Sequence, residues 1–286
     1  MLTTEVGGSS DLVARLIAQG ISGPLGQQVI VDNRGGSLNI LGQLLATAIP
    51  DGHTVLLGTG SLWVLPLIQK APYDPVRDYA PVTVVARAPN VLVVHPTLPV
   101  KSVKELINLA QAKPGQLNYA SGIAGSSLHL AGELFKAMAG VNIVQIWYKG
   151  QGPALIDTIA GQVQMMFPTA ISVPAHIQSG RLRGLGVTST QPSALLPELP
   201  AIAATVPGYE SGTVLTIFAP AKTPRAIIER LNREVVGFLR RPEMKDKLVA
   251  MGADPVGSTP EEFATLMKSE LVRLGKLIKD AGIRAD

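Results

Sequence analysis

The hydrophobic residues follow two periods that alternate along the chain. An apolar stripe over residues 12–22 predicts a helix that ends before Gly23. Short β-branched and apolar runs at 28–32 and 54–58 predict strands, and the stripe at 41–48 predicts a helix between them. This alternation of strand and helix is typical of parallel βαβ units.

The same alternation continues to the end of the chain. We expect further strands at 82–87, 90–95, 116–120, 142–147, 163–167, 182–187 and 214–218, and helices at 101–113, 127–139, 153–160, 173–178, 224–239, 242–251 and 260–283. The pattern divides into two α/β units that are joined near residues 95 and 215. We therefore predict one domain from 1–95 and 215–286 and a second from 96–214.

Composition narrows the class of protein. Of the 286 residues 46% are hydrophobic, yet no apolar run reaches the roughly 18 to 20 residues of a membrane span, so we expect a soluble globular protein. The net charge is +4, but the basic residues are scattered among few aromatics, which argues against nucleic acid and suits a small anionic ligand. The absence of cysteine excludes thiol catalysis, cysteine zinc sites and disulfides.

Two loops rich in glycine and serine, at 6–11 and 120–127, each follow a strand and lead into an amphipathic helix. Free N–H groups and hydroxyls at the positive end of a helix dipole hold a phosphate or carboxylate without a fixed cation. In the alternative interpretation, serine and aspartate are ordinary helix caps and glycine an ordinary turn residue. The other helix starts lack these glycines, and ligands of open α/β sheets bind at the carboxyl ends of strands. The pair therefore predicts a two-sided anion clamp.

Candidates for catalysis are weak. The four histidines show no zinc-binding spacing, and no nucleophile elbow or nucleotide-binding motif occurs. His129 lies one turn into the helix after the second loop. It is either an indirect partner of the anion, acting through the groups that contact it, or a half-buried helix residue, and we favour the latter. Thr59 and Ser61 follow a strand and are kept as ligand contacts. Tyr148 and Lys149 also follow a strand, where Lys149 either faces a ligand or is a solvated loop lysine.

A series of short segments spans the chain in order. They are GGSSD (7–11), NR (33–34), PDG (50–52), LLGT (56–59), PYDP (72–75), VHP (94–96), NYAS (118–121), HLAGELF (129–135), YKG (148–150), LPELP (196–200), FAP (218–220) and GSTPEE (257–262). Together they resemble the Bug family, the periplasmic solute-binding receptors of tripartite tricarboxylate transporters. Each segment is weak alone, but the combination is specific.

The resemblance implies a type II periplasmic-binding-protein fold, a Venus flytrap of two α/β domains linked by two crossing hinge strands. It implies a ligand carboxylate held between the two loops, and it assigns this contact to Gly8, Ser9, Ser10, Asp11, Ser121, Gly122, Gly125, Ser126 and Ser127. We expect a non-catalytic monomer, without cofactor or metal, that delivers a small carboxylate to integral membrane permease subunits. The alternatives are a cytoplasmic small-acid sensing domain of the same fold and a hydrolase-like enzyme built on it.

Three departures from the family pattern matter. The apolar first strand is reduced to residues 1–6, so the start looks truncated, and we expect a periplasmic protein whose leader is absent from this numbering. Leu41 replaces a glycine and narrows the space near the cleft. Where amino-acid-binding members have an aspartate for the ligand ammonium, this chain has Pro168 followed by Thr169. We therefore expect a dicarboxylate, hydroxy acid or aromatic acid rather than an amino acid, unless Glu5 meets an ammonium from the opposite wall.

Overall fold

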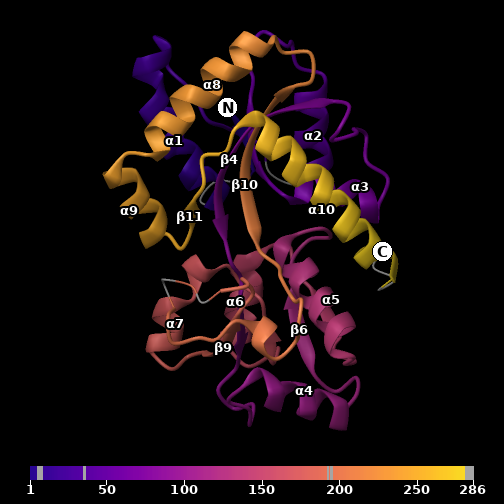
Figure 1. Ribbon diagram of the computed structural model, residues 1–286. Coiled ribbons are helices and arrows are strands. Elements are labelled where there is room, and N and C mark those ends of the chain that lie inside the picture. The colour runs from indigo at the N-terminus through magenta and orange to yellow at the C-terminus, as the bar shows by residue number, and fades with distance from the viewer. Residues whose placement is uncertain (5–8, 35–36, 192, 194–195, 281–286) are drawn as a thin grey trace.

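The computed structural model describes residues 1–4, 9–34, 37–191, 193 and 196–280. They form two α/β halves that lie one above the other in Figure 1. In these ranges no helix is both long and apolar enough to cross a membrane. The expectations for Gly8 and Glu5 fall outside the described residues.

The first half is built on a six-stranded sheet with the order β11-β4-β10-β3-β1-β2. Its strands are Asp254–Pro255, Tyr79–Ala88, Thr213–Pro220, Leu56–Thr59, Leu2–Thr3 and Asp32–Asn33, in that order. Strand β1 pairs in parallel with β2 and β3, so the first strand keeps a place inside the sheet although it is only two residues long. Strand β10 is antiparallel to β3 and β4.

Helices cover both faces of this sheet (Figure 1). One face carries α1 (Ser9–Leu25), α8 (Arg225–Leu239) and α9 (Pro242–Ala250), and the other carries α2 (Leu38–Ala46), α3 (Ser61–Ile68) and α10 (Pro260–Asp280). Successive strand residues point to opposite faces. Leu215 and Ile217 of β10 therefore enter the first core, while Phe218 enters the second.

The second half contains a five-stranded sheet with the order β7-β6-β8-β5-β9. Its strands are Val144–Trp147, Asn118–Ser121, Met165–Met166, Val91–Val94 and Arg183–Val187, in that order. Its helices are α4 (Val103–Ala112), α5 (Ser127–Ala139), α6 (Gln151–Ile159) and α7 (Pro174–Gln178), with short 3-10 turns at Ala170–Ser172 and Ile202–Ala204. Leu92 and Val94 pack in one core and Val91 and Val93 in the other, as the strand period requires.

Two strands connect the halves and confirm the expected two-domain fold. Strand β4 continues through Pro89 and Asn90 into β5, and the chain returns from the second half into β10. The two crossings lie side by side, because β4 and β10 pair from Thr213 with Ala88 onward (Figure 1). Since β5 pairs within the second sheet, the first crossing comes before the expected boundary at residue 95. The domain limits themselves stay a prediction.

Several elements differ from their expected bounds. Helix α1 continues through Gly23 to Leu25. The N–H of Gly26 donates a hydrogen bond to the carbonyl of Gly23 at 3.0 Å and so forms one more turn. In place of the strand expected at 28–32 the structure has β2 at 32–33, because β1, its neighbour in the described sheet, offers two residues for pairing. Helix α3 was not expected. This helix is buried and apolar on nearly every side. Its sequence therefore lacks the hydrophobic periodicity by which a helix is told from a strand.

Candidate functional site

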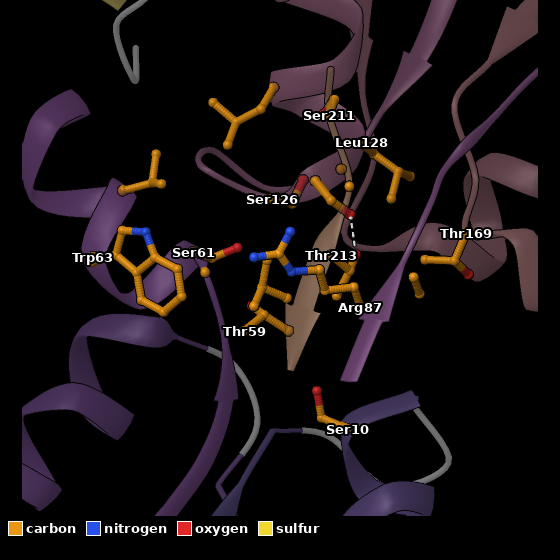
Figure 2. A pocket seen from close by; sticks show the side chains of 18 of the residues that line it. Ser10, Thr59, Ser61, Trp63, Arg87, Ser126, Leu128, Thr169, Ser211 and Thr213 are labelled. Atoms are coloured by element: carbon orange, nitrogen blue, oxygen red, sulfur yellow. Dashed lines mark hydrogen bonds between the residues drawn. The ribbon is translucent and has the colours of Figure 1, made fainter. Parts of the chain in front are cut away.

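A cavity of about 440 Å³ lies between the two halves and beside the crossing strands. This volume is within the range of about 300 to 1,000 Å³ that is typical of small-molecule sites. The described polar residues that line it are Thr4, Ser10, Arg34, Ser37, Thr59, Ser61, Arg87, Ser126, Ser127, Lys149, Gln151, Thr169, Ser189, Thr190, Glu210, Ser211, Thr213, Asp254, Glu270 and Arg273. Figure 2 shows several of these side chains directed toward the same space.

The β6–α5 loop is the best-defined wall of the cavity. Ser126 caps α5, because its hydroxyl accepts the N–H of His129 at 3.3 Å and its own N–H donates to the carbonyl of Ile123 at 3.0 Å. In the part of the chain that the structure describes, the N–H groups of Ser127 and Leu128 have no acceptor. Two donors at the positive end of a helix are therefore free for an anion.

His129 supports this loop from inside the fold. Its side chain is only 1% exposed, its ring packs against Trp147 at 5.1 Å between centroids, and its Nδ1 accepts the N–H of Gly125 at 3.1 Å. Burial lowers the pKa of the imidazole below its usual value of 6.5. The expectation of a half-buried helix residue is therefore wrong: His129 is neutral, buried and bonded to the loop, because its own first helical turn brings it beneath Gly125.

Gly125 itself contacts the other half of the protein. Its φ of +76° is in the left-handed region, and a Cβ built there would lie 3.7 Å from the Cα of Leu65 in α3. A side chain in this conformation costs about 1 to 2 kcal/mol. A Cβ would still fit beside α3 at ordinary van der Waals distance, so the left-handed turn is the reason that this position favours glycine.

A second pair of polar residues fixes the opposite side of the cavity. The side chain of Gln151, at the start of α6, accepts the N–H of Thr169 at 2.9 Å and donates to its hydroxyl at 3.2 Å. Both residues line the cavity. Gln151 thereby orients Thr169, and no sequence motif marked Gln151 as a candidate.

Four arginine and lysine side chains reach the cavity, and they differ in their partners. Arg34 pairs with Asp32 at 2.9 Å, and Arg273 pairs with a carboxylate of its own helix. Arg87 and Lys149 have no carboxylate within 4.0 Å in the described part of the chain. Figure 2 shows the guanidinium of Arg87 extending from β4 to the middle of the cavity.

The cavity includes most but not all of the expected contacts. Those that line it are Ser10, Thr59, Ser61, Gly122, Ser126, Ser127, Lys149 and Thr169, and Leu41 lines it as well. Ser9 begins α1, and its side chain is outside the described residues. Gly125, as above, meets α3 rather than the cavity. Four further expected residues have other partners.

These four residues interact with neighbouring parts of the fold and do not line the cavity. The carboxylate of Asp11 lies 3.0 Å from Arg15 Nε, and the hydroxyl of Ser121 is buried beneath the loop. The hydroxyl of Tyr148 donates to Asp157 at 2.8 Å, and burial together with that bond raises its pKa to about 12. The ring of Pro168 is buried away from the cavity and only its carbonyl has a partner, the N–H of Val91. We do not count these four among the cavity contacts.

The sequence missed several residues that line the cavity. Arg87, Ser211 and Thr213 belong to the crossings or lie next to them, and Trp63 belongs to the unexpected helix α3. The alternation of residues along a strand does not predict whether a side chain at a crossing points into the space between the two halves. No sequence pattern therefore identified these residues as candidates. Three or more histidine, aspartate or glutamate side chains that could share a metal ion do not occur together in the described ranges.

Comparison with known proteins agrees with this architecture. The family described as "Tripartite tricarboxylate transporter family receptor" matches residues 13–283. A "UPF0065 protein in tcbD-tcbE intergenic region" of Pseudomonas sp. (strain P51) is 40% identical over 98% of this chain and 84% of its own length. Protein BugT of Bordetella pertussis is 34% identical over 97% of this chain and 87% of its own.

Solved structures give the same result. R. palustris Rpa4515 with adipate is 37% identical, with a TM-score of 0.91 over 99% of this chain and 97% of that chain. MatC from Rhodopseudomonas palustris with bound malate is 26% identical, with a TM-score of 0.86 over 97% of this chain and 98% of that chain. The match extends over nearly the whole of both chains in each case. This protein therefore belongs to the tripartite tricarboxylate transporter receptor family, which includes the Bug proteins.

Proposed function

We propose that this protein is a solute receptor that holds a small organic carboxylate in the cavity between its two halves. The observation that carries the proposal is the β6–α5 loop, where Ser127 and Leu128 line a cavity rich in hydroxyls and their N–H groups have no acceptor in the described part of the chain. Each hydrogen bond to a charged carboxylate contributes about 1.5 to 3 kcal/mol. The bound adipate of Rpa4515 and malate of MatC support the same ligand class.

The proposed ligand has no ammonium group. Thr169 is the residue of its segment that reaches the cavity, and it offers only a neutral hydroxyl. A buried ammonium without a carboxylate partner is unfavourable by several kcal/mol. Three carboxylates also line the cavity. Glu210 and Asp254 are exposed, where water screens them, and the half-buried Glu270 is already paired with Arg273 at 2.8 Å. Dicarboxylates, hydroxy acids and aromatic acids are therefore preferred over amino acids.

The proposed receptor acts by domain closure. Strands β4 and β10 form the paired crossing about which the halves rotate, as in other periplasmic binding proteins. The protein works in the periplasm as a monomer, carries out no catalysis, and passes its ligand to integral membrane permease subunits. Small-angle scattering of the protein with saturating ligand should give a smaller radius of gyration than that of the free protein. Identical profiles would contradict closure.

The decisive experiment is native mass spectrometry of the purified protein, followed by calorimetry with the acid that is released. We expect a co-purified organic acid that binds with one site per chain. The amide of the same acid should bind at least about tenfold more weakly, since it loses one charge-assisted contact. Equal affinity for acid and amide, or turnover of the acid or its esters, would overturn the proposal.

A further inference from the structure

The Arg87 side chain lines the cavity but has no part in the proposed contact between a carboxylate and the β6–α5 loop. It comes from β4, one of the two crossing strands, and not from either glycine-rich loop. Figure 2 shows its guanidinium in the middle of the cavity, on the side of Ser61 and Ser126. A guanidinium is always charged and presents a planar set of donors that fits a carboxylate.

The charge of Arg87 is not neutralised by the protein in the described part of the chain. Its register partner on β11 is Asp254, yet the two side chains form no ion pair within 4.0 Å. Asp254 itself is exposed. The other two arginines of the cavity wall, Arg34 and Arg273, are each paired with a neighbouring carboxylate. Arg87 thus retains its full capacity to bind an anion.

An irregularity in the crossing strands lies next to Arg87. Between the pairs Leu215 with Ala86 and Thr216 with Val84, Val85 of β4 has no partner on β10. Such a bulge changes the direction of the side chains that follow it, and bulges are frequent beside functional sites. Three buried residues, from Val82 to Val84, precede the bulge, whereas Arg87 after it is exposed and lines the cavity.

We propose that Arg87 binds a second carboxylate of the ligand, so that the receptor selects dianionic over monoanionic acids. The first carboxylate binds the β6–α5 loop, where the hydrogen-bond donors are uncharged. The second binds the guanidinium of Arg87. The ligand chain between the two carboxylates spans the cavity. This inference rests on the proposed function and adds the residue that sets the charge of the ligand.

The test is a cycle of matched ligands and variants. Calorimetry with succinate, glutarate and adipate, each compared with butyrate, valerate and hexanoate, keeps chain length fixed and removes one carboxylate. Wild-type protein should bind its best diacid about ten- to a hundredfold more tightly than the matching monoacid. In Arg87→Gln this preference should disappear through weaker diacid binding, with the monoacid affinity unchanged within about twofold.

Two further variants make the result specific. Arg87→Lys keeps the charge but loses the planar donor set, and should retain part of the preference. Arg34→Gln removes a cavity arginine that is already paired with Asp32, and should change diacid and monoacid binding equally. Since the Arg87 side chain is exposed, thermal unfolding of Arg87→Gln should match that of the wild type.

The outcomes separate this inference from the proposed function. If folded wild-type protein binds neither diacids nor monoacids, the carboxylate receptor itself is wrong. If it binds both equally, or if Arg87→Gln weakens both by the same factor, the receptor stands and the assignment of Arg87 is overturned.

Discussion

The hydroxyl of Thr213 donates a hydrogen bond to the hydroxyl of Ser127 at 3.0 Å (dashed line in Figure 2). Thr213 is the first residue of the crossing strand β10, and Ser127 is the first residue of α5. The amide of Asn90, in the other crossing, also reaches the Ser127 hydroxyl, at 3.5 Å. Both crossings are thus bonded to the start of the helix that we propose binds the carboxylate. We therefore expect a change of angle at the crossings to move the start of this helix.

Replacing Thr213 with valine should weaken this link while keeping the shape of the side chain. We expect a loss of about 1 kcal/mol in the free energy of unfolding, measured by urea titration, because one neutral hydrogen bond is removed. Ligand affinity should also fall, by up to about tenfold. Thr158→Val is the control, since Thr158 is equally buried but bonds to Ala154 within α6, far from the loop. If both variants bind ligand as the wild type does, the link has no role in binding.

Replacing Ser126 with alanine should reduce both stability and affinity. Removal of a helix cap typically costs about 1 kcal/mol, and loss of the hydroxyl that lines the cavity should weaken acid binding about tenfold. Ser102→Ala removes the same type of cap from α4, where the Ser102 hydroxyl accepts the N–H of Glu105 at 3.2 Å. That control should lose similar stability and no affinity. Equal affinities of the two variants would contradict a role for Ser126 in the site.

Gly125→Ala should destabilise the protein by about 1 to 2 kcal/mol, because alanine strains the left-handed backbone. The added Cβ would meet Leu65 only at ordinary van der Waals distance, 3.5 Å from its Cδ1, so any loss of ligand affinity should come from the strained backbone of the loop. Gly237→Ala is the matched control. Gly237 is helical with open space around it, and alanine there should raise stability by about 0.5 to 1 kcal/mol. A Gly125→Ala variant as stable as the wild type would show that the turn does not need glycine.

Stability should depend on pH through His129. Because burial lowers its pKa in the folded protein, the unfolded chain takes up the proton first as the pH falls. The free energy of unfolding should therefore be highest above about pH 6.5 and should decline from there down to the folded-state pKa. Protonation of Nδ1 in the folded protein also removes the acceptor for Gly125, so acid binding should weaken as the pH falls through the folded-state pKa, at the lower end of this range.

His129→Gln should flatten this pH dependence in urea titrations. His176 is a useful comparison, since its pKa is also lowered, mainly by burial and then by Arg181. His176→Gln should therefore also reduce the dependence of the free energy of unfolding on pH. It should leave ligand affinity unchanged. A His129→Gln variant that keeps the full wild-type slope would disprove the role of this imidazole.

A thermal-shift comparison of succinate and aspartate tests the ligand class directly. We expect succinate to raise the melting temperature and aspartate to leave it unchanged, because the carboxylates that line the cavity among the described residues are either exposed or, like Glu270, already paired with an arginine. Glu210→Gln should not alter this order. Stabilisation by aspartate alone would reverse the assignment, and its loss in Glu210→Gln would then identify the ammonium partner.

Local patterns predicted much of this structure. The helix expected at 127–139 has the same bounds as α5, since the serine cap before it and the glycine after it are both part of the sequence. The order of strands and helices and the loop in front of α5 were also predictable. Helix α3 was not, because a segment that is apolar on all sides packs as its neighbours require rather than as its own period dictates.

The sequence by itself determined two α/β units, a glycine- and serine-rich loop at the start of α5, and a chemistry without cysteine. Only the tertiary structure decided which polar groups share the cavity. Thr213 and Ser127 are 86 residues apart along the chain and become bonded only when both crossings pair. The direction of Arg87 depends on a bulge between β4 and β10, which is a property of two strands together. Local sequence preferences decide where a helix or strand forms and where it ends. The direction in which a side chain points at a domain boundary is decided by long-range strand pairing and packing.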